Sequence, residues 1–192
     1  MAHFESEFEQ SLNFTPSVKN MTNPKYKGSR AFTHKWRGMV LSQDGTDPED
    51  TGYALDDLRV IAEESVRLPA DFTCHPRLQR FHIDNRVKGL AKDSIDWATA
   101  EAMALGSLNL QGFNTRVVGE DSERGTFSQR HAVFHDQNEY GRTYTPLQEN
   151  IVRGPNSGRF QVLNTNLNEV GTMGYEYGYS LESPKNLCMW EA

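Results

Sequence analysis

The residues best suited to chemistry lie in two short segments of the chain. The first, residues 119–131, contains carboxylates, arginines and one histidine. The second, residues 164–169, ends in Glu169 at the start of a glycine-bearing helical pattern. Each segment follows a predicted strand, and open parallel sheets bind ligands beyond the carboxyl ends of their strands. Both segments are therefore candidates for a ligand site.

Each segment also has a purely structural explanation. Residues 119–131 could form a solvated loop held by local ion pairs, which are common and contribute little to stability. His131 and His135 are four residues apart and would face one side of a helix, but a metal site needs a third ligand at fitting spacing. A glutamate in the first turn of a helix complements the helix dipole. Residue types and spacing alone favour these structural explanations.

A wound α/β sheet would position the two segments. Apolar residues at helical spacing predict a helix that is entered at Thr51 and stopped by Pro69, a second after Pro76, and a third that Asp96 opens as its N-cap and Gly112 ends. In the third helix an apolar stripe is expected to lie against the sheet, formed by Trp97, Ala100, Ala104, Leu105 and Leu108. His75 and His82, in the second helix, are interpreted as structural residues.

Short β-branched or apolar runs predict the strands at residues 115–118, 160–163 and 187–190. Residues 169–180 have helix-compatible spacing despite three glycines, and a short helix is predicted at residues 4–12. Helices alternating with strands in this way are typical of a wound, mostly parallel α/β sheet with flanking helices.

Composition excludes several classes of protein. The 192 residues carry a formal net charge of −6, the pI is about 5.5 and the mean hydropathy is −0.69. No apolar run approaches the roughly 20 residues of a membrane-spanning helix, and nucleic-acid binding would require clustered basic residues. Cys74 and Cys188 lie far apart and are expected to be reduced thiols. The N-terminal residues 1–7 are acidic and show no targeting signal.

Longer motifs give a more specific result. From Asp96 onward the chain contains, in this order, Asp96-Trp97-Ala98-Thr99-Ala100-Glu101, Gly119-Glu120-Asp121, Arg124-Gly125-Thr126-Phe127-Ser128-Gln129-Arg130-His131-Ala132, Tyr144-Thr145-Pro146-Leu147, Leu167-Asn168-Glu169, Gly174-Tyr175-Glu176-Tyr177-Gly178, Ser183-Pro184 and Trp190-Glu191-Ala192. In the identity, order and approximate spacing of these motifs the chain resembles the first component of the 2-oxoglutarate dehydrogenase family. Before Asp96 the likeness is looser, with Trp36-Arg37-Gly38-Met39 as its best anchor. Gln129 within Ser-Gln-Arg-His is similar to the 2-oxoadipate-type paralogue, although some bacterial 2-oxoglutarate enzymes also have glutamine there.

The resemblance implies a thiamine-diphosphate-binding fold. Residues 1–94 would be a connecting region of loops and helices, and residues 95–192 the N-terminal part of a transketolase-like pyrimidine-binding domain with an incomplete sheet. In the family, a glutamate hydrogen-bonds the aminopyrimidine ring of thiamine diphosphate and so promotes loss of the thiazolium proton. Glu169 occupies that position, Leu167 would line the pyrimidine pocket, and Gln129 and His131 would border the substrate site. Magnesium would be bound by a domain absent from this chain.

The resemblance also implies a reaction and partners. The parent protein would be a homodimer that oxidatively decarboxylates 2-oxoglutarate or 2-oxoadipate and passes the acyl group to a lipoyl acyltransferase component. Its location would be the mitochondrial matrix in a eukaryote and the cytoplasm otherwise. The chain itself is expected to be an inactive fragment.

Two alternatives remain at this point. One is a short, inactive protein that binds a full-length homologue. The other is a pyruvate-type thiamine enzyme, against which Arg124-Gly125-Thr126-Phe127 and Trp190-Glu191-Ala192 argue. The chain also departs from the family pattern at Val118 and Asn168, where serine is usual.

Overall fold

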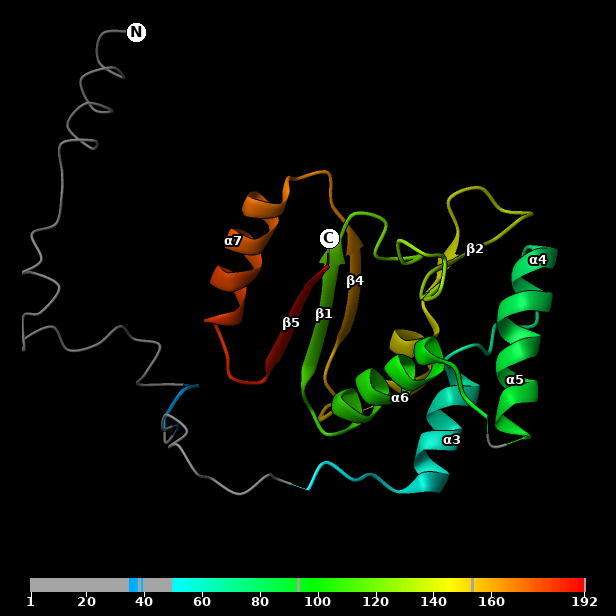
Figure 1. Ribbon diagram of the computed structural model, residues 1–192, viewed down its shortest axis with the longest axis horizontal. Helices are drawn as coiled ribbons and strands as arrows, with labels where there is room; N and C mark the ends of the chain where they lie inside the picture. The colour runs from blue at the N-terminus through cyan, green and yellow to red at the C-terminus, as the bar shows by residue number, and fades with distance from the viewer. Residues whose placement is uncertain (1–34, 38, 40–49, 93, 153, 192) are drawn as a thin grey trace, which may run out of the picture. The chain divides into compact units, whose positions relative to one another are not determined.

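A computed structural model describes residues 35–37, 39, 50–92, 94–152 and 154–191 (Figure 1). The chain divides into two compact units, Met1–Gly38 and Met39–Ala192, and every helix and strand described below lies in the second. The helix predicted at residues 4–12 lies outside the described residues.

Three parallel strands form the main sheet, as the sequence predicted. They are β1 (Asn114–Gly119), β4 (Phe160–Asn164) and β5 (Asn186–Glu191), in the order β4-β1-β5. Val117 of β1 stands opposite Val162 and Met189. Because all three strands run in the same direction, their carboxyl ends meet at one edge (Figure 1).

Two helices cover opposite faces of this sheet (Figure 1). On one face, α6 (Trp97–Leu110) packs Leu105 into a core that contains Val117. On the other face, α7 (Glu169–Ser180) packs against β5 and β1. The predicted bounds of α7 are confirmed. Helices on both faces of a parallel sheet confirm the predicted α/β class.

The buried face of α6 differs from the prediction. Asp96 caps the helix as expected, since its side chain accepts a 2.7 Å hydrogen bond from the Thr99 amide. However, Trp97 is 85% exposed, and Ala100 and Ala104 also face outward. The buried residues are Ala98, Thr99, Ala102, Met103, Leu105, Gly106, Ser107 and Asn109. A helix with small or apolar residues on every side gives no clear periodicity, so close packing decides which face is buried.

The first predicted helix is α3 (Leu55–Glu64), which begins after the predicted entry at Thr51 and ends well before Pro69. It lies close to α6, because a Cβ atom at Gly106 would collide with the Ile61 side chain. The second predicted helix forms in three parts, α4 (Pro76–Leu78), the π-helix η2 (Gln79–Ile83) and α5 (Asp84–Leu90).

The sequence did not predict a small second layer. β2 (Phe134–His135) pairs antiparallel with β3 (Thr143–Tyr144), and a π-helix, η3, spans Leu147–Ile151. Phe134 is 1% exposed and packs in a second core cluster with Val66, Phe72 and Ile83.

Candidate active site

The two candidate segments meet at the carboxyl edge of the sheet. The amide of Thr165 donates to the carbonyl oxygen of Gly119 at 3.0 Å. The amide of Glu123 donates to Asn164 Oδ1 at 2.9 Å. These bonds join the segment after β1 to the segment after β4, as expected for ends of adjacent parallel strands.

Arg130 anchors the first segment to the rest of the fold. Its side chain is 7% exposed and binds two carboxylates in bidentate geometry. Nε and Nη2 donate to Glu101 of α6 at 2.6 and 3.0 Å, and Nη1 and Nη2 donate to Glu191 of β5 at 2.5 and 2.7 Å. Burial alone would lower the pKa of Arg130, but the hydrogen bonds to both carboxylates outweigh it and raise that pKa. The same bonds lower the pKa of Glu191.

This network differs from the solvated loop that residue types suggested. The partners of Arg130 lie 29 and 61 positions away in the sequence, so the ion pairs are not local. No spacing in the sequence signals such a pairing. Arg130 is a positioning residue that sequence reasoning missed.

Within the first segment, Gln129 folds back on its own turn. Gly125 has a φ of +83°, and a Cβ atom there would overlap the Gln129 amide group. Gln129 Oε1 accepts a 3.1 Å hydrogen bond from the amide of Phe127. Its Nε2 donor has no hydrogen bond among the described residues.

His131 lies at the end of this turn with a left-handed backbone, φ +42°. Its ring packs edge to face on His82 at a centroid distance of 5.2 Å. Burial lowers the pKa of His131 and nearby Arg124 adds to this, whereas a backbone hydrogen bond at Ser128 opposes it. The imidazole is therefore neutral at physiological pH.

His131 and His135 do not share a helix face. His131 lies outside the helices and strands, and His135 lies in the strand β2. Among the residues that the structure describes, no three His, Cys, Asp or Glu side chains form a metal-binding group.

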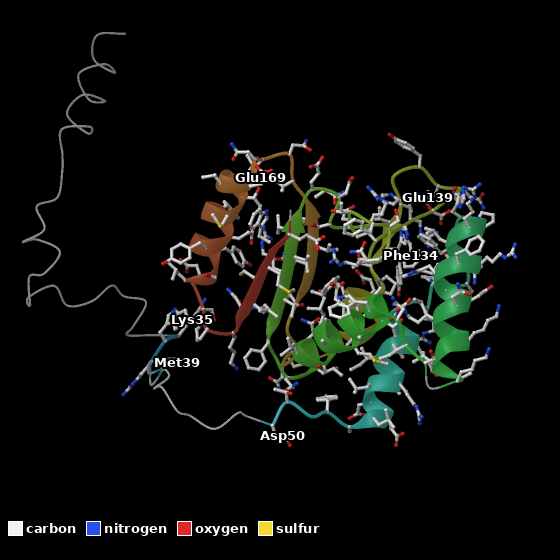
Figure 2. All side chains as sticks on the ribbon, in the orientation of Figure 1. Lys35, Met39, Asp50, Phe134, Glu139 and Glu169 are labelled. Carbon is white, nitrogen blue, oxygen red and sulfur yellow. The ribbon has the colours of Figure 1, made fainter. Side chains whose placement is uncertain are left out.

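Glu169 is the first residue of α7, beyond the carboxyl end of β4 (Figure 2). Asn168 caps the helix, accepting a 2.8 Å hydrogen bond from the Gly171 amide. Asparagine is as good an N-cap as serine, so the departure at Asn168 preserves the helix start. Glu169 is exposed, and its carboxylate has no hydrogen bond or ion pair within the described part of the chain. Leu167, beside it, is 61% exposed.

A buried ion pair that residue spacing did not predict holds α7 on the sheet. Arg116 of β1 donates to both oxygens of Glu176 at 2.7 and 3.0 Å, and the two side chains are 11% and 5% exposed. The hydrogen bond with Glu176 raises the pKa of Arg116 despite its burial. Val118 and Leu167 line a hollow of about 170 Å³ beside this pair. The pair therefore sets the position of the helix that begins with Glu169.

Glu169 and Leu167, two residues apart, present an exposed carboxylate and an exposed apolar side chain at the carboxyl edge of the sheet. No helix in residues 50–92, 94–152 or 154–191 is long and apolar enough to cross a membrane.

A parallel sheet with helices on both faces defines a wound α/β domain. The chain belongs to the family described as "Transketolase, pyrimidine binding domain", which matches residues 93–192.

Comparison with curated proteins shows which members of the family have similar sequences. A probable 2-oxoadipate dehydrogenase complex component E1 homolog of Dictyostelium discoideum is 45% identical over 88% of this chain and 19% of that protein. The 2-oxoadipate dehydrogenase complex component E1 of Homo sapiens is 43% identical over 100% of this chain and 20% of that protein. The mitochondrial 2-oxoglutarate dehydrogenase of Saccharomyces cerevisiae is 40% identical over 98% of this chain and 18% of that protein.

These relatives confirm the resemblance to the first component of the 2-oxoglutarate dehydrogenase family. The chain spans about a fifth of the length of the curated relatives it matches. The alternative of an inactive binding protein receives no support from them.

Proposed function

We propose that the chain forms part of a thiamine-diphosphate-dependent 2-oxo acid dehydrogenase and contributes the glutamate that activates the cofactor. The observation that carries this proposal is Glu169, free at the start of α7 beyond the sheet edge, within the matched domain.

Each residue of the site has a proposed role. Thiamine diphosphate, when bound, supplies the electron sink for decarboxylation. The Glu169 carboxylate would hold a proton at the pyrimidine ring nitrogen of the bound cofactor, and Leu167 would shield one side of that ring from water. The Arg116–Glu176 pair keeps α7 in place, since a misplaced acid–base group loses much of its effect.

The segment at residues 119–131 would border the substrate. The Oε1 atom of Gln129 is already used by Phe127, so the group left for a ligand is its Nε2 donor. A donor suits the carboxylate and oxo oxygens of a 2-oxo dicarboxylic acid. The neutral ring of His131 can donate or accept a hydrogen bond beside it.

The substrate, partners, metal and location are proposed from the family resemblance. The substrate would be 2-oxoadipate or 2-oxoglutarate, with transfer of the acyl group to a lipoyl acyltransferase partner. The parent protein would be a homodimer, would bind magnesium through a domain outside this chain, and in a eukaryote would act in the mitochondrial matrix. Residues 1–94 would connect that domain to residues 95–192.

A chimera tests this function. Residues 1–192 would replace the matching fifth of the Dictyostelium relative, and decarboxylation of both acids would be measured with an artificial electron acceptor. The proposal expects activity that requires thiamine diphosphate and is lost in Glu169→Ala. A chimera that folds, binds the cofactor and keeps its activity with Glu169→Ala would refute it.

A further inference from the structure

Three aromatic rings form a cluster behind the first segment of the candidate site. His82 packs edge to face on His131 at 5.2 Å and against Phe134 at 6.0 Å. Phe134 lies in β2, is 1% exposed and anchors the cluster in the core (Figure 2). His82 thus connects the core to the ring of His131.

The backbone that presents His82 is unusual. His82 lies within η2, the single π-helical turn that interrupts the helix between Pro76 and Leu90. A π turn accommodates one extra residue in a helix, and such turns are frequent at functional sites. The side chain that this turn places against the candidate site is His82.

The chemistry of His82 is also not that of an ordinary core residue. Its Nε2 atom is buried and has no hydrogen-bond partner among the described residues. An unpaired buried nitrogen destabilises a fold, and phenylalanine would fill the same space without one. His82 therefore acts on its neighbours through ring contact and not through a hydrogen bond at Nε2.

The surroundings keep both rings uncharged. Burial lowers the pKa of His82 to about 3, and Arg86 of α5 and His131 add to this, opposed by Asp96 at the start of α6. Arg124 acts in the same direction on His131. Two neutral imidazoles can pack edge to face, whereas two charged ones would repel each other.

We propose that His82 is a positioning residue for His131, whose ring orientation and neutral form it maintains at the border of the candidate substrate site. The mechanism is ring contact: His82 shields one face of His131 from water and limits its rotation. The relevance to catalysis rests on the proposed function, but the effect on His131 itself does not.

Side-chain NMR of the 192-residue chain, with labelled histidines, tests the proposal directly. The titration of His131 would be compared in the parent chain, His82→Ala and His82→Phe. His82→Ala opens His131 to water, so its pKa should rise toward the ordinary value near 6.5. His82→Phe retains the ring contact, so the pKa of His131 should stay below that value. His135→Ala removes an exposed imidazole four residues from His131 and is the matched control, with no expected change.

Two results would overturn the proposal. One is an unchanged titration of His131 in His82→Ala. The other is a rise of the pKa of His131 in His82→Phe to the ordinary value near 6.5, a result that can be read even if His82→Ala unfolds. The NMR result and the proposed function can fail separately. If the pKa of His131 rises in His82→Ala while Glu169→Ala leaves decarboxylation intact in the chimera, the inference about His82 stands and only the proposed function fails.

Discussion

Replacing Arg130 should destabilise the fold more than any other single change in the candidate site. Arg130→Met removes four hydrogen bonds to Glu101 and Glu191 and leaves two carboxylates facing an apolar side chain. Each charge-assisted bond has a net value of about 1.5–3 kcal/mol, but bonds from one group are not additive. Both glutamates are 28% exposed, so water can partly solvate them in the variant.

The expected loss is therefore about 3–5 kcal/mol, the range for breaking one side of a buried ion pair. That is a large part of the roughly 5–15 kcal/mol that holds a domain folded. Urea unfolding at neutral pH, followed by circular dichroism, measures it. Arg67→Ala is the matched control, because its pair with Glu64 is 59% and 20% exposed and should contribute less than about 1 kcal/mol.

A second variant checks the reasoning. Arg130→Met combined with Glu101→Gln and Glu191→Gln removes the charges that the single change leaves unpaired. The triple variant should recover stability relative to Arg130→Met, since uncompensated buried charge is the main cost. A single variant within about 1 kcal/mol of the parent, or a triple variant less stable than the single one, would refute this account of the network.

Three further predictions concern stability and its pH dependence. Between pH 6.5 and about 3 the unfolded chain binds a proton at His82 that the folded chain does not. This residue therefore makes the free energy of unfolding fall with falling pH by up to about 1.4 kcal/mol per pH unit. His82→Phe should flatten that part of the plot of unfolding free energy against pH, and an unchanged slope would contradict the burial of His82. Glu191 has a lowered pKa in the fold, so its contribution is full above pH 5 and is lost as pH falls through its folded pKa; the difference in unfolding free energy between the parent and Glu191→Gln should shrink with acid, and a constant difference would contradict the ion pair. Gly106→Ala should cost about 1–3 kcal/mol because its Cβ would collide with Ile61, whereas Gly174→Ala, with open space around it, should gain up to about 1 kcal/mol in thermal or urea unfolding; equal effects would contradict the packing of α3 on α6.

Local signals predicted much of the fold. The β-branched run at residues 115–118 and the helix at residues 169–180 are strong local patterns, and both are confirmed. Asp96 caps its helix as predicted, because capping depends only on residues within one turn. The placement of both candidate segments at one edge followed from the rule for parallel sheets.

Long-range and very short features escaped prediction. The two-residue strands β2 and β3 are too short to show an alternating pattern. The pairs that Arg130 and Arg116 make join elements distant in sequence. The composition of α6 does not reveal which of its faces is buried, so it did not predict that Trp97 faces outward or that Gly106 lies against Ile61 of α3.

His82 shows how chemistry can depend on such features. In the sequence it is an ordinary helix residue, interpreted as structural. Its contact with His131 requires both the π turn η2 and the left-handed backbone at His131. Neither conformation has a clear signature in residue types, so only the folded chain brings the two rings together.

The central claim is that Glu169 activates thiamine diphosphate, and proton exchange at the cofactor tests it most directly. In the chimera described above, the exchange of the thiazolium carbon-bound proton with deuterium would be followed by NMR with bound cofactor and no substrate. Glu169→Gln should slow this exchange by about 10²-fold or more, the effect of losing a positioned acid–base group. Glu182→Gln, an exposed glutamate just after the same helix, should leave the rate unchanged. Exchange in Glu169→Gln as fast as in the parent, with cofactor bound, would contradict the claim.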